Sequence, residues 1–157
     1  MILVRHAVSA DLPYLAEIAK TSATAAHWTS DEYAKLFAPE MVQERVTLVI
    51  EQNGTVAGFI VARPLEEEWE IENIAVTGSA RRRGLGSHLL GEFLDLARNR
   101  GGTQVFLEVR ESNHAARALY EKWAFIECGR RGSYYQEPAE DAVILRFSFP
   151  QGCIKLG

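Results

Sequence analysis

A short loop of arginines and glycines between a β-rich run and a long amphipathic helix constrains the fold of this chain most. The loop is Arg81-Arg82-Arg83-Gly84-Leu85-Gly86, the preceding run covers residues 71–76, and a helix is predicted over residues 84–100. Glycines let a backbone approach a ligand closely, and the amides at a helix N-terminus attract anions. The sequence therefore predicts a strand-loop-helix unit that cradles the pyrophosphate of a nucleotide-tailed cofactor, with the arginines as added cations.

The spacing of this loop excludes two other phosphate-binding motifs. A dinucleotide fingerprint requires a third glycine three residues after the second, and position 89 is Leu. A Walker loop requires Gly-Lys-Ser/Thr, whereas Gly86 is followed by Ser87-His88. The residues alone leave two interpretations: a loop for a different nucleotide cofactor, or an arginine-rich helix start without a ligand.

Length and composition fit a single domain over residues 1–157. A chain of 157 residues can bury a real hydrophobic core, and its net charge of -4 argues against a general nucleic-acid or membrane binder. No apolar run approaches the length of a membrane span. Cys128 and Cys153 lack CxxC spacing and the histidines lack metal-ligand spacing, so we expect no metal and a reduced, cytoplasmic setting.

Apolar periodicity and turn residues predict seven strands and four helices in the order β-α-α-β-β-β-α-β-α-β-β. Gln52-Asn53-Gly54 is a strong hairpin signal, Gly101-Gly102 is expected to end the longest helix, and residues 132–140 are expected to form a loop. Strands are predicted at 1–6, 46–51, 55–63, 69–76, 103–109, 125–129 and 141–149, and the other helices from 9–13 to 19, from 29 or 30 to near 39, and over 113–123.

The loop and several further segments resemble the GCN5-related N-acetyltransferases, the GNAT family. The loop matches the family's Arg/Gln-x-x-Gly-x-Gly/Ala acetyl-CoA motif, and residues 107–125 resemble a block of the bacterial ribosomal-protein N-terminal alanine acetyltransferases. Further matches are Asn73-Ile74-Ala75-Val76, Trp28 beside a hydroxyl residue, and Tyr134-Tyr135 before Glu140-Asp141-Ala142. The resemblance, which covers essentially the whole chain, implies an α+β fold with α/β/α layers. Its mixed, mostly antiparallel twisted sheet would have about seven strands, about four flanking helices, and a V-shaped splay between the fourth and fifth strands.

The resemblance also implies acetyl-CoA as the cofactor. The backbone of Ile74, Ala75 and Val76 would hold the acetyl and pantetheine portion, and a backbone amide would polarise the thioester carbonyl. Asn113 is placed to cap the helix that follows it, and in the family it also contacts the cofactor. The remaining cofactor-binding residues implied by the family are Arg81, Arg82, Arg83, Gly84, Leu85, Gly86, Ser87 and Tyr120.

Acetyl transfer to an amine needs a base for the amine and a proton for the leaving thiolate. By resemblance, Glu108 is the general base and Tyr120 the general acid. Phe106 shares a strand face with Glu108 and should disfavour the charged carboxylate, while a phenol with a pKa of about 10 can protonate a thiolate. Residue pattern alone leaves open that Glu108 is an ion-paired carboxylate at a strand end and that Tyr120 is a core tyrosine.

Four further residues are candidates for contact with the acceptor substrate. Glu72 is a rival base, because related enzymes use a carboxylate on its strand. Tyr134 and Tyr135 would line a peptide groove or pack against each other, and Trp28 would contact substrate or brace a helix. Arg130 and Arg131 are expected to be solvated, and we assign them no role.

One position departs from the family pattern. Where the family has Gly-Phe after the helix, this chain has Ala124-Phe125, preceded by Trp123 instead of a small aliphatic residue. If the backbone at this turn adopts a positive φ, Ala124 costs on the order of 1 kcal/mol relative to glycine. The departure puts the substrate fit near this turn in question.

These residues favour an acetyl-CoA-dependent N-acetyltransferase that modifies a peptide or protein N-terminus by direct transfer in a ternary complex. An α-amine with a pKa of about 8 is partly neutral at pH 7, which suits a moderate base. The alternatives are acetylation of a small amine, such as an aminoglycoside, polyamine or amino acid, and a non-catalytic acyl-CoA sensor. We expect a monomer or a homodimer, with no nucleic-acid or membrane partner.

Overall fold

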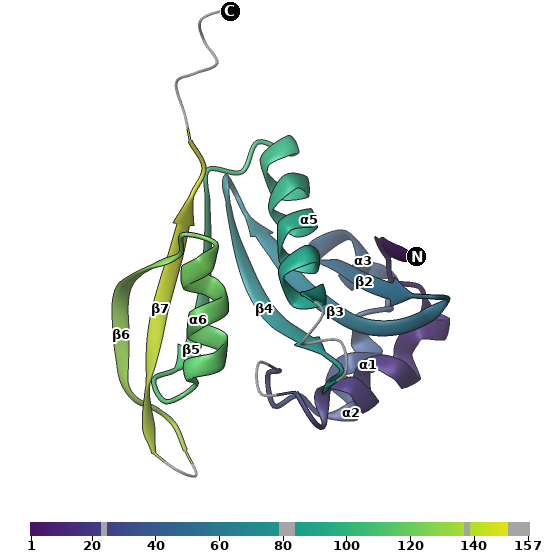
Figure 1. The fold of residues 1–157 in the computed structure, drawn as a ribbon, viewed down its shortest axis with the longest axis horizontal. Helices are drawn as coiled ribbons and strands as arrows, with labels where there is room; N and C mark the ends of the chain where they lie inside the picture. Colours follow the sequence, from purple (N-terminus) through teal and green to yellow (C-terminus); the bar gives the residue numbers. More distant parts are fainter. Residues whose placement is uncertain (23–24, 79–83, 137–138, 151–157) are drawn as a thin grey trace, which may run out of the picture.

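A single sheet of seven strands forms the centre of the molecule. The structure, a computed structural model, describes residues 1–22, 25–78, 84–136 and 139–150. The sheet order is β1-β2-β3-β4-β5-β7-β6, and every neighbouring pair is antiparallel except β4 and β5 (Figure 1). The mixed, mostly antiparallel sheet implied by the family resemblance is confirmed. The strands are β1 Ile2–His6, β2 Val46–Gln52, β3 Thr55–Leu65, β4 Glu68–Val76, β5 Gln104–Arg110, β6 Ile126–Tyr135 and β7 Glu140–Ser148.

Helices cover both faces of this sheet, which gives the α/β/α layers expected. Alternate residues of β2 and β3 point to opposite layers: Val49 and Phe59 pack with α1 and α2, whereas Ile50 and Ile60 pack with α5. This double burial explains the near-continuous apolar runs of the central strands. The helical elements are a 3-10 turn at Ser9–Asp11, α1 Leu12–Ala19, α2 Ser30–Lys35, α3 Pro39–Glu44, α5 Leu85–Asn99 and α6 His114–Lys122.

The short helix α3 was not predicted. We took Pro39 as the end of the preceding helix, but it is the first residue of α3. Proline is favoured at that position because the first helical N–H has no partner within the helix and the ring presets φ. The same residue can therefore stop one helix and start the next.

Apolar contact holds the longest described helix, α5, against the sheet. Its buried face is the one read from the sequence, and each fully buried large apolar side chain contributes about 1.5–3 kcal/mol. The helix ends before Gly101, at φ 83°, and a side chain on Gly102 would lie 2.8 Å from the Ala97 carbonyl oxygen. The predicted Gly101-Gly102 stop is thus confirmed. At 15 residues α5 is too short to cross a membrane, and the other described helices are shorter.

The parallel strands β4 and β5 pair only briefly and then separate. Their register covers residues 68–70 of β4 and 104–106 of β5, after which the strands diverge in a V (Figure 1). On its other edge, β4 carries an irregularity: Asn73 pairs with Val61 and Ile71 with Ala62, so that Glu72 has no register partner on β3. The splay expected between the fourth and fifth strands is therefore present, and it opens the sheet where the site lies.

The strand β6 is longer than predicted. It continues through residue 135, past the predicted end at 129 and into the segment 132–140 where we expected a loop, and Tyr135 pairs with Glu140 on β7. The register shifts twice along this pair, and Ser133 adopts a φ of 51° while its N–H donates to the Asp141 carboxylate at 2.9 Å. Irregularities of this kind interrupt the two-residue alternation by which a strand is recognised in a sequence.

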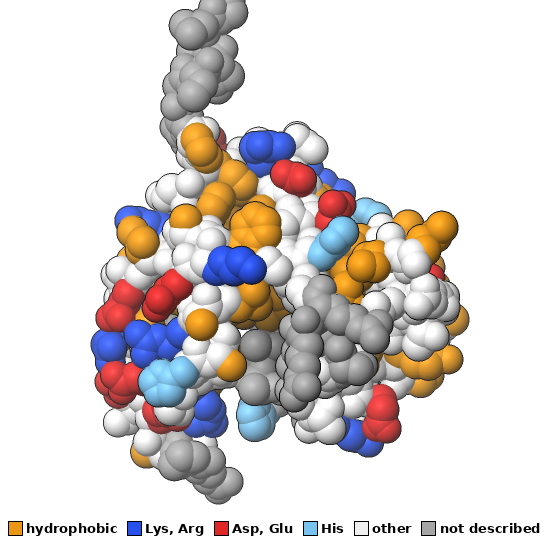
Figure 2. Space-filling model, viewed as in Figure 1, with side chains coloured by type: hydrophobic (Ala, Val, Ile, Leu, Met, Phe, Trp, Pro, Cys, Tyr) orange, Lys and Arg blue, Asp and Glu red, His pale blue; other side chains and the backbone are white. Residues whose placement is uncertain are grey.

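The surface over α6 carries both positively and negatively charged side chains. Lys and Arg side chains lie among Asp and Glu side chains over α6 and the neighbouring strands, while apolar side chains gather nearer the end of β7 and the N-terminal edge (Figure 2). Interspersed charge is the ordinary pattern of a water-exposed face.

The turn after α6 contains the alanine that departs from the family pattern. Ala124 has a φ of 68°, as expected for a position usually held by glycine. We predict that Ala124→Gly raises the free energy of unfolding by about 1 kcal/mol, because glycine adopts this conformation without a Cβ clash. Urea denaturation measures the change.

The matched control for this substitution is Ala118→Gly in the middle of α6, where Ala118 is exposed. There the same exchange should lower the free energy of unfolding by about 0.5–1 kcal/mol. A loss of stability in both variants would contradict the interpretation of the turn.

Candidate active site

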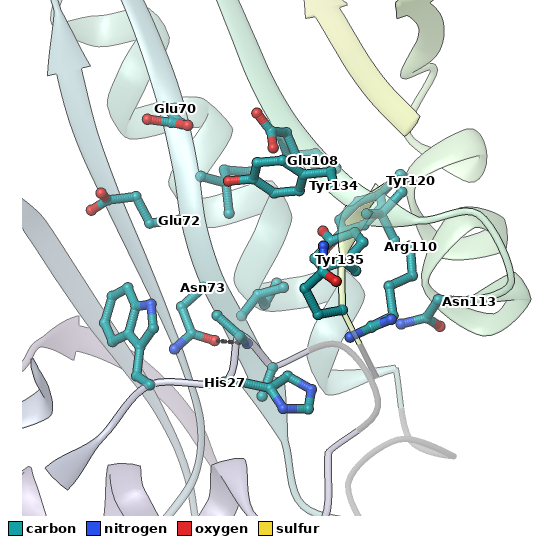
Figure 3. A pocket seen from close by; sticks show the side chains of 18 residues that line it. His27, Glu70, Glu72, Asn73, Glu108, Arg110, Asn113, Tyr120, Tyr134 and Tyr135 are labelled. Atoms are coloured by element: carbon teal, nitrogen blue, oxygen red, sulfur yellow. Dashed lines mark hydrogen bonds between the residues drawn. The ribbon is translucent and has the colours of Figure 1, made fainter. Parts of the chain in front are cut away.

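A cavity of about 470 Å³ lies where β4 and β5 diverge. Its walls come from residues 25–28, β4, β5, Asn113 just before α6, Tyr120 on α6, and the end of β6 (Figure 3). Segments distant in sequence meet here because the splay breaks the sheet between its two halves. The cavity brings together these predicted site residues: Trp28, Glu72, Ile74, Glu108, Asn113, Tyr120, Tyr134 and Tyr135.

Glu108 projects from β5 into this cavity. Alternation along β5 buries Val105, Leu107 and Val109 in the core and turns Glu108 to the opposite face, where its side chain is 19% exposed. Burial raises the pKa of Glu108, with a further increase from the charge of Glu70, although the positive charge of Arg131 acts in the opposite direction. The carboxylate is therefore more basic than a solvated glutamate.

The cation beside Glu108 is Arg131, whose Nε lies 3.0 Å from Oε1. Arg131 is exposed, as expected, but we had assigned it no role, and the extension of β6 carries it alongside the pocket, where it pairs with Glu108. The structure pairs Glu108 with Arg131 on β6, whereas Arg110 lies 3.3 Å from Glu140 and stacks over the Tyr135 ring. Glu108 is therefore ion-paired and also lines the cavity, so the pairing leaves its predicted role as the base open.

Tyr120 is buried on the inner face of α6. It is 3% exposed, its ring centroid lies 5.6 Å from that of Phe125, and it lines the cavity. Burial raises the pKa of Tyr120 well above that of a solvated phenol, with a smaller contribution from Tyr135. The phenol therefore remains protonated at neutral pH and is both a core residue and a cavity residue.

Glu72, the rival base, is held by two arginines. Arg45 donates from Nε to Oε1 at 2.6 Å and from Nη2 to Oε2 at 3.1 Å, and Arg63 Nε lies 3.7 Å from Oε2. Both carboxylate oxygens are engaged on the β4 side of the cavity, across from Glu108 (Figure 3). The alternative base is therefore already occupied by two arginine partners from outside β4.

The end of β6 forms an aromatic wall. The rings of Tyr134 and Tyr135 meet edge to face with centroids 5.2 Å apart, and Arg110 and Arg131 lie over Tyr135 and Tyr134 at 4.3 and 5.4 Å. Burial raises the pKa of Tyr135, as does the nearby Glu108 charge. Packing and pocket lining, the two alternatives for this tyrosine pair, are both observed.

Asn73 was missed as a site residue. It is 3% exposed, its Oδ1 accepts the Ala26 N–H at 2.8 Å, and its Nδ2 donates to the Tyr33 hydroxyl at 3.1 Å. Tyr33 in turn packs against Trp28, with ring centroids 5.3 Å apart. Asn73 thus ties the wall at residues 25–28 to β4. The signal that could have identified it was a polar residue at a position where the alternation of Trp69 and Ile71 predicts a buried apolar side chain.

We predict that Asn73→Ala lowers the free energy of unfolding by about 1–3 kcal/mol, because it leaves the buried Tyr33 hydroxyl and the Ala26 amide without their partner. Urea denaturation measures the change, and Asn99→Ala at the exposed end of α5 should alter it by less than about 0.5 kcal/mol. Equal stability of the two variants would contradict the tethering role.

The end of the site near α5 carries the predicted cofactor residues that the structure describes. Gly84 precedes α5 in the left-handed conformation, φ 73°, and a Cβ added at Gly86 would reach only ordinary contact distance, 3.8 Å from Val76. The side chain of Asn113 accepts the Ala116 N–H at 3.1 Å, which confirms the predicted cap of α6. Arg81, Arg82 and Arg83 lie outside the described residues.

Trp123, the second departure from the family pattern, fills the space between α5 and α6. Its Nε1 donates to Ser87 Oγ at 2.7 Å, so the side chain of this predicted cofactor residue bonds within the protein. A Cβ added at Gly91 would lie 2.8 Å from the Trp123 ring. Gly91 is thus what makes room for the larger side chain.

The remaining cofactor residues of β4 are placed by their burial. The Ala75 side chain packs in the core beneath α1, and Val76 packs in the core on the α5 side. Neither residue lines the cavity, so a role in ligand binding would fall to their backbone.

Comparisons with known proteins agree with this arrangement. The model of the Acetyltransferase (GNAT) family matches residues 12–125. The chain is 38% identical over 113 residues to the [ribosomal protein bS18]-alanine N-acetyltransferase of Escherichia coli K12, covering 71% of this chain and 76% of that protein. The corresponding protein of Salmonella typhimurium LT2 is 36% identical over 113 residues, with the same coverage. The crystal structure of the E. coli ribosomal-protein-S18-alanine N-acetyltransferase superposes with a TM-score of 0.86 at 31% identity, over 100% of this chain and 99% of that one.

Proposed function

Because this chain belongs to the GNAT acetyltransferase family and is an N-acetyltransferase, we propose that it transfers an acetyl group from acetyl-CoA to the N-terminal α-amine of a protein. The similar bacterial proteins act on the alanine of ribosomal protein bS18, which supports a substrate of the same type. The observation that carries the proposal is the cavity in the β4–β5 splay, where a shielded carboxylate and a buried phenol line one space. A ribosomal-protein substrate fits the cytoplasmic setting expected from the cysteines.

The residues near the N-terminus of α5 fit a cofactor with a diphosphate. α5 has 15 residues, begins after a left-handed glycine and presents its first backbone amides beside the small Gly86. When bound, acetyl-CoA supplies an activated acetyl group as a thioester. The residues proposed to hold it are Ile74, Ala75, Val76, Arg81, Arg82, Arg83, Gly84, Leu85, Gly86, Ser87, Asn113 and Tyr120.

Glu108 is proposed to accept the proton of the substrate ammonium. An α-ammonium has a pKa of about 8. The difference between this pKa and that of the accepting carboxylate is smaller when the pKa of the carboxylate is raised, as it is for Glu108. A lysine ammonium near 10.4 presents a gap about two units larger. The basicity of this site therefore favours α-amines over lysine side chains.

Tyr120 is proposed to donate to the leaving sulfur. Its raised pKa makes full proton transfer in the ground state unfavourable, so its contribution should come as negative charge develops on sulfur. A buried donor is effective at this stage because little water competes with it.

Direct transfer in a ternary complex is proposed over a covalent cysteine route. Cys128 is exposed on β6 and is absent from the described lining of the cavity, and Cys153 lies outside the described residues. The amine itself is then the nucleophile that attacks the acetyl group. Trp28, Tyr134, Tyr135 and Glu72 are proposed to form the walls around the peptide.

The test is thiol release from acetyl-CoA by the purified protein with three kinds of acceptor. One is a peptide beginning with alanine, the second is its N-blocked twin containing lysine, and the third is a panel of small amines. Turnover with the free N-terminus alone is expected. Preferred turnover of small amines would move the function to that class, and cofactor binding without turnover on any acceptor would favour an acyl-CoA sensor.

A further inference from the structure

The proposed base has a cationic partner that the proposed reaction does not use. Arg131 Nε lies 3.0 Å from Oε1 of Glu108. The strand register explains this contact. Arg131 pairs with Ala142 of β7, and Ala142 pairs with Arg110 of β5. Arg110 lies two positions from Glu108 on β5, so Arg131 and Glu108 lie on the same face of the sheet. The contact therefore follows from the arrangement of three strands.

This arginine is only partly shielded. Its side chain is 56% exposed, against 19% for Glu108, and its guanidinium lies 5.4 Å from the centroid of the Tyr134 ring. An ion pair with one exposed partner is weak, because water screens it and the long side chain loses freedom. Arg131 can therefore separate from the carboxylate at a small cost in free energy when another cation binds there.

Three other arginines near this cavity have partners of their own. Arg110 lies between Glu140 and the Tyr135 ring, and Arg45 and Arg63 pair with Glu72 and Glu70 on β4. Among the described residues, Arg131 is the cation that forms an ion pair with Glu108. The titratable and charged groups nearest this carboxylate or lining the same cavity are Glu70 and Glu72 on β4, Arg110 on β5, Arg131, Tyr134 and Tyr135 on β6, Tyr120 on α6, and His27 before α2, with Arg146 on the adjacent strand β7.

We propose that Arg131 is a positioning residue that keeps the Glu108 carboxylate ionised and oriented until the substrate ammonium takes its place. This inference rests on the proposed role of Glu108 as the base. Without Arg131, burial and Glu70 would act on Glu108 unopposed, and the carboxylate would be protonated at higher pH. The base must be deprotonated to work, so activity should fall on the acid side and persist on the alkaline side.

Steady-state kinetics over pH 5.5–9.5 with the alanine peptide test this role in Arg131→Gln, Arg131→Lys and Arg130→Gln. Arg131→Gln should move the acid limb of kcat/KM to higher pH, with about three- to tenfold lower values near pH 6 and little change near pH 9. Arg131→Lys should restore most of the loss. Arg130 is the control: it neighbours Arg131 in sequence but pairs with Glu111 and Glu127, so Arg130→Gln should match the wild type.

A second readout does not depend on turnover. The Glu108 side-chain carboxyl is followed by ¹³C NMR during a pH titration of the free protein, with Glu108→Gln to assign its resonance. Arg131→Gln should raise the pKa of Glu108 and Arg130→Gln should leave it unchanged. An unaltered titration in Arg131→Gln would overturn the inference, whereas failure to acetylate the peptide would count against the proposed function and leave this titration decisive for Arg131.

Discussion

Glu108→Gln should lower kcat/KM for an alanine peptide by about 10²–10⁴-fold, the range for loss of a general base. Glutamine keeps the size of the side chain but cannot accept the ammonium proton. The loss should appear mainly in kcat, because the walls formed by residues 25–28 and by the β6 tyrosines remain. Initial rates of thiol release at saturating acetyl-CoA measure it.

Glu72→Gln is the matched comparison, since Glu72 lines the same cavity from β4 and is also paired with arginine. Its effect should be smaller, less than about tenfold, because Arg45 and Arg63 already engage that carboxylate. Thermal unfolding of both variants separates chemistry from folding. A larger catalytic loss in Glu72→Gln would assign the base to β4 instead.

Tyr120→Phe should lower kcat by about 10–10³-fold with little change in KM, because one hydrogen-bond donor to a developing charge is removed. Phenylalanine keeps the ring packing against Phe125, 5.6 Å away between centroids. The fold should therefore survive. Burst and steady-state kinetics with the same peptide measure the change.

The control is Tyr33→Phe, which removes the hydroxyl of another buried tyrosine. That hydroxyl accepts from Asn73, so its loss should reduce stability by about 1 kcal/mol with kcat largely retained. Wild-type kcat in Tyr120→Phe would remove Tyr120 from the proposed chemistry and leave it as a core residue.

Short sequence patterns predicted those parts of the fold and site that depend on neighbouring residues, such as strand alternation, a helix cap and a turn. Alternation along β5 placed Glu108 on the same strand face as Phe106, and the Asn113 cap followed from a short polar side chain before a helix. Asn53-Gly54 marked the β2–β3 turn, where both residues have positive φ. Each of these features depends on residues within a few positions of one another.

Features that depend on distant segments were not predicted. The Arg131–Glu108 pair requires β6 to pass through two register shifts, and the tether from Asn73 to Ala26 joins positions 47 apart in sequence. Trp123 was recognised only as a departure, because its fit depends on Gly91 in another helix. Strand register and helix packing decide such contacts, and neither leaves a clear local pattern.

The most direct measurement uses one peptide that carries both a free N-terminal alanine and a lysine. After incubation with acetyl-CoA, tandem mass spectrometry locates the acetyl group for the wild type and for Glu108→Gln. We expect acetylation of the alanine α-amine by the wild type and its loss in the variant. Acetyl on the lysine side chain, or equal α-acetylation by both proteins, would contradict an N-terminal acetyltransferase that uses Glu108 as its base.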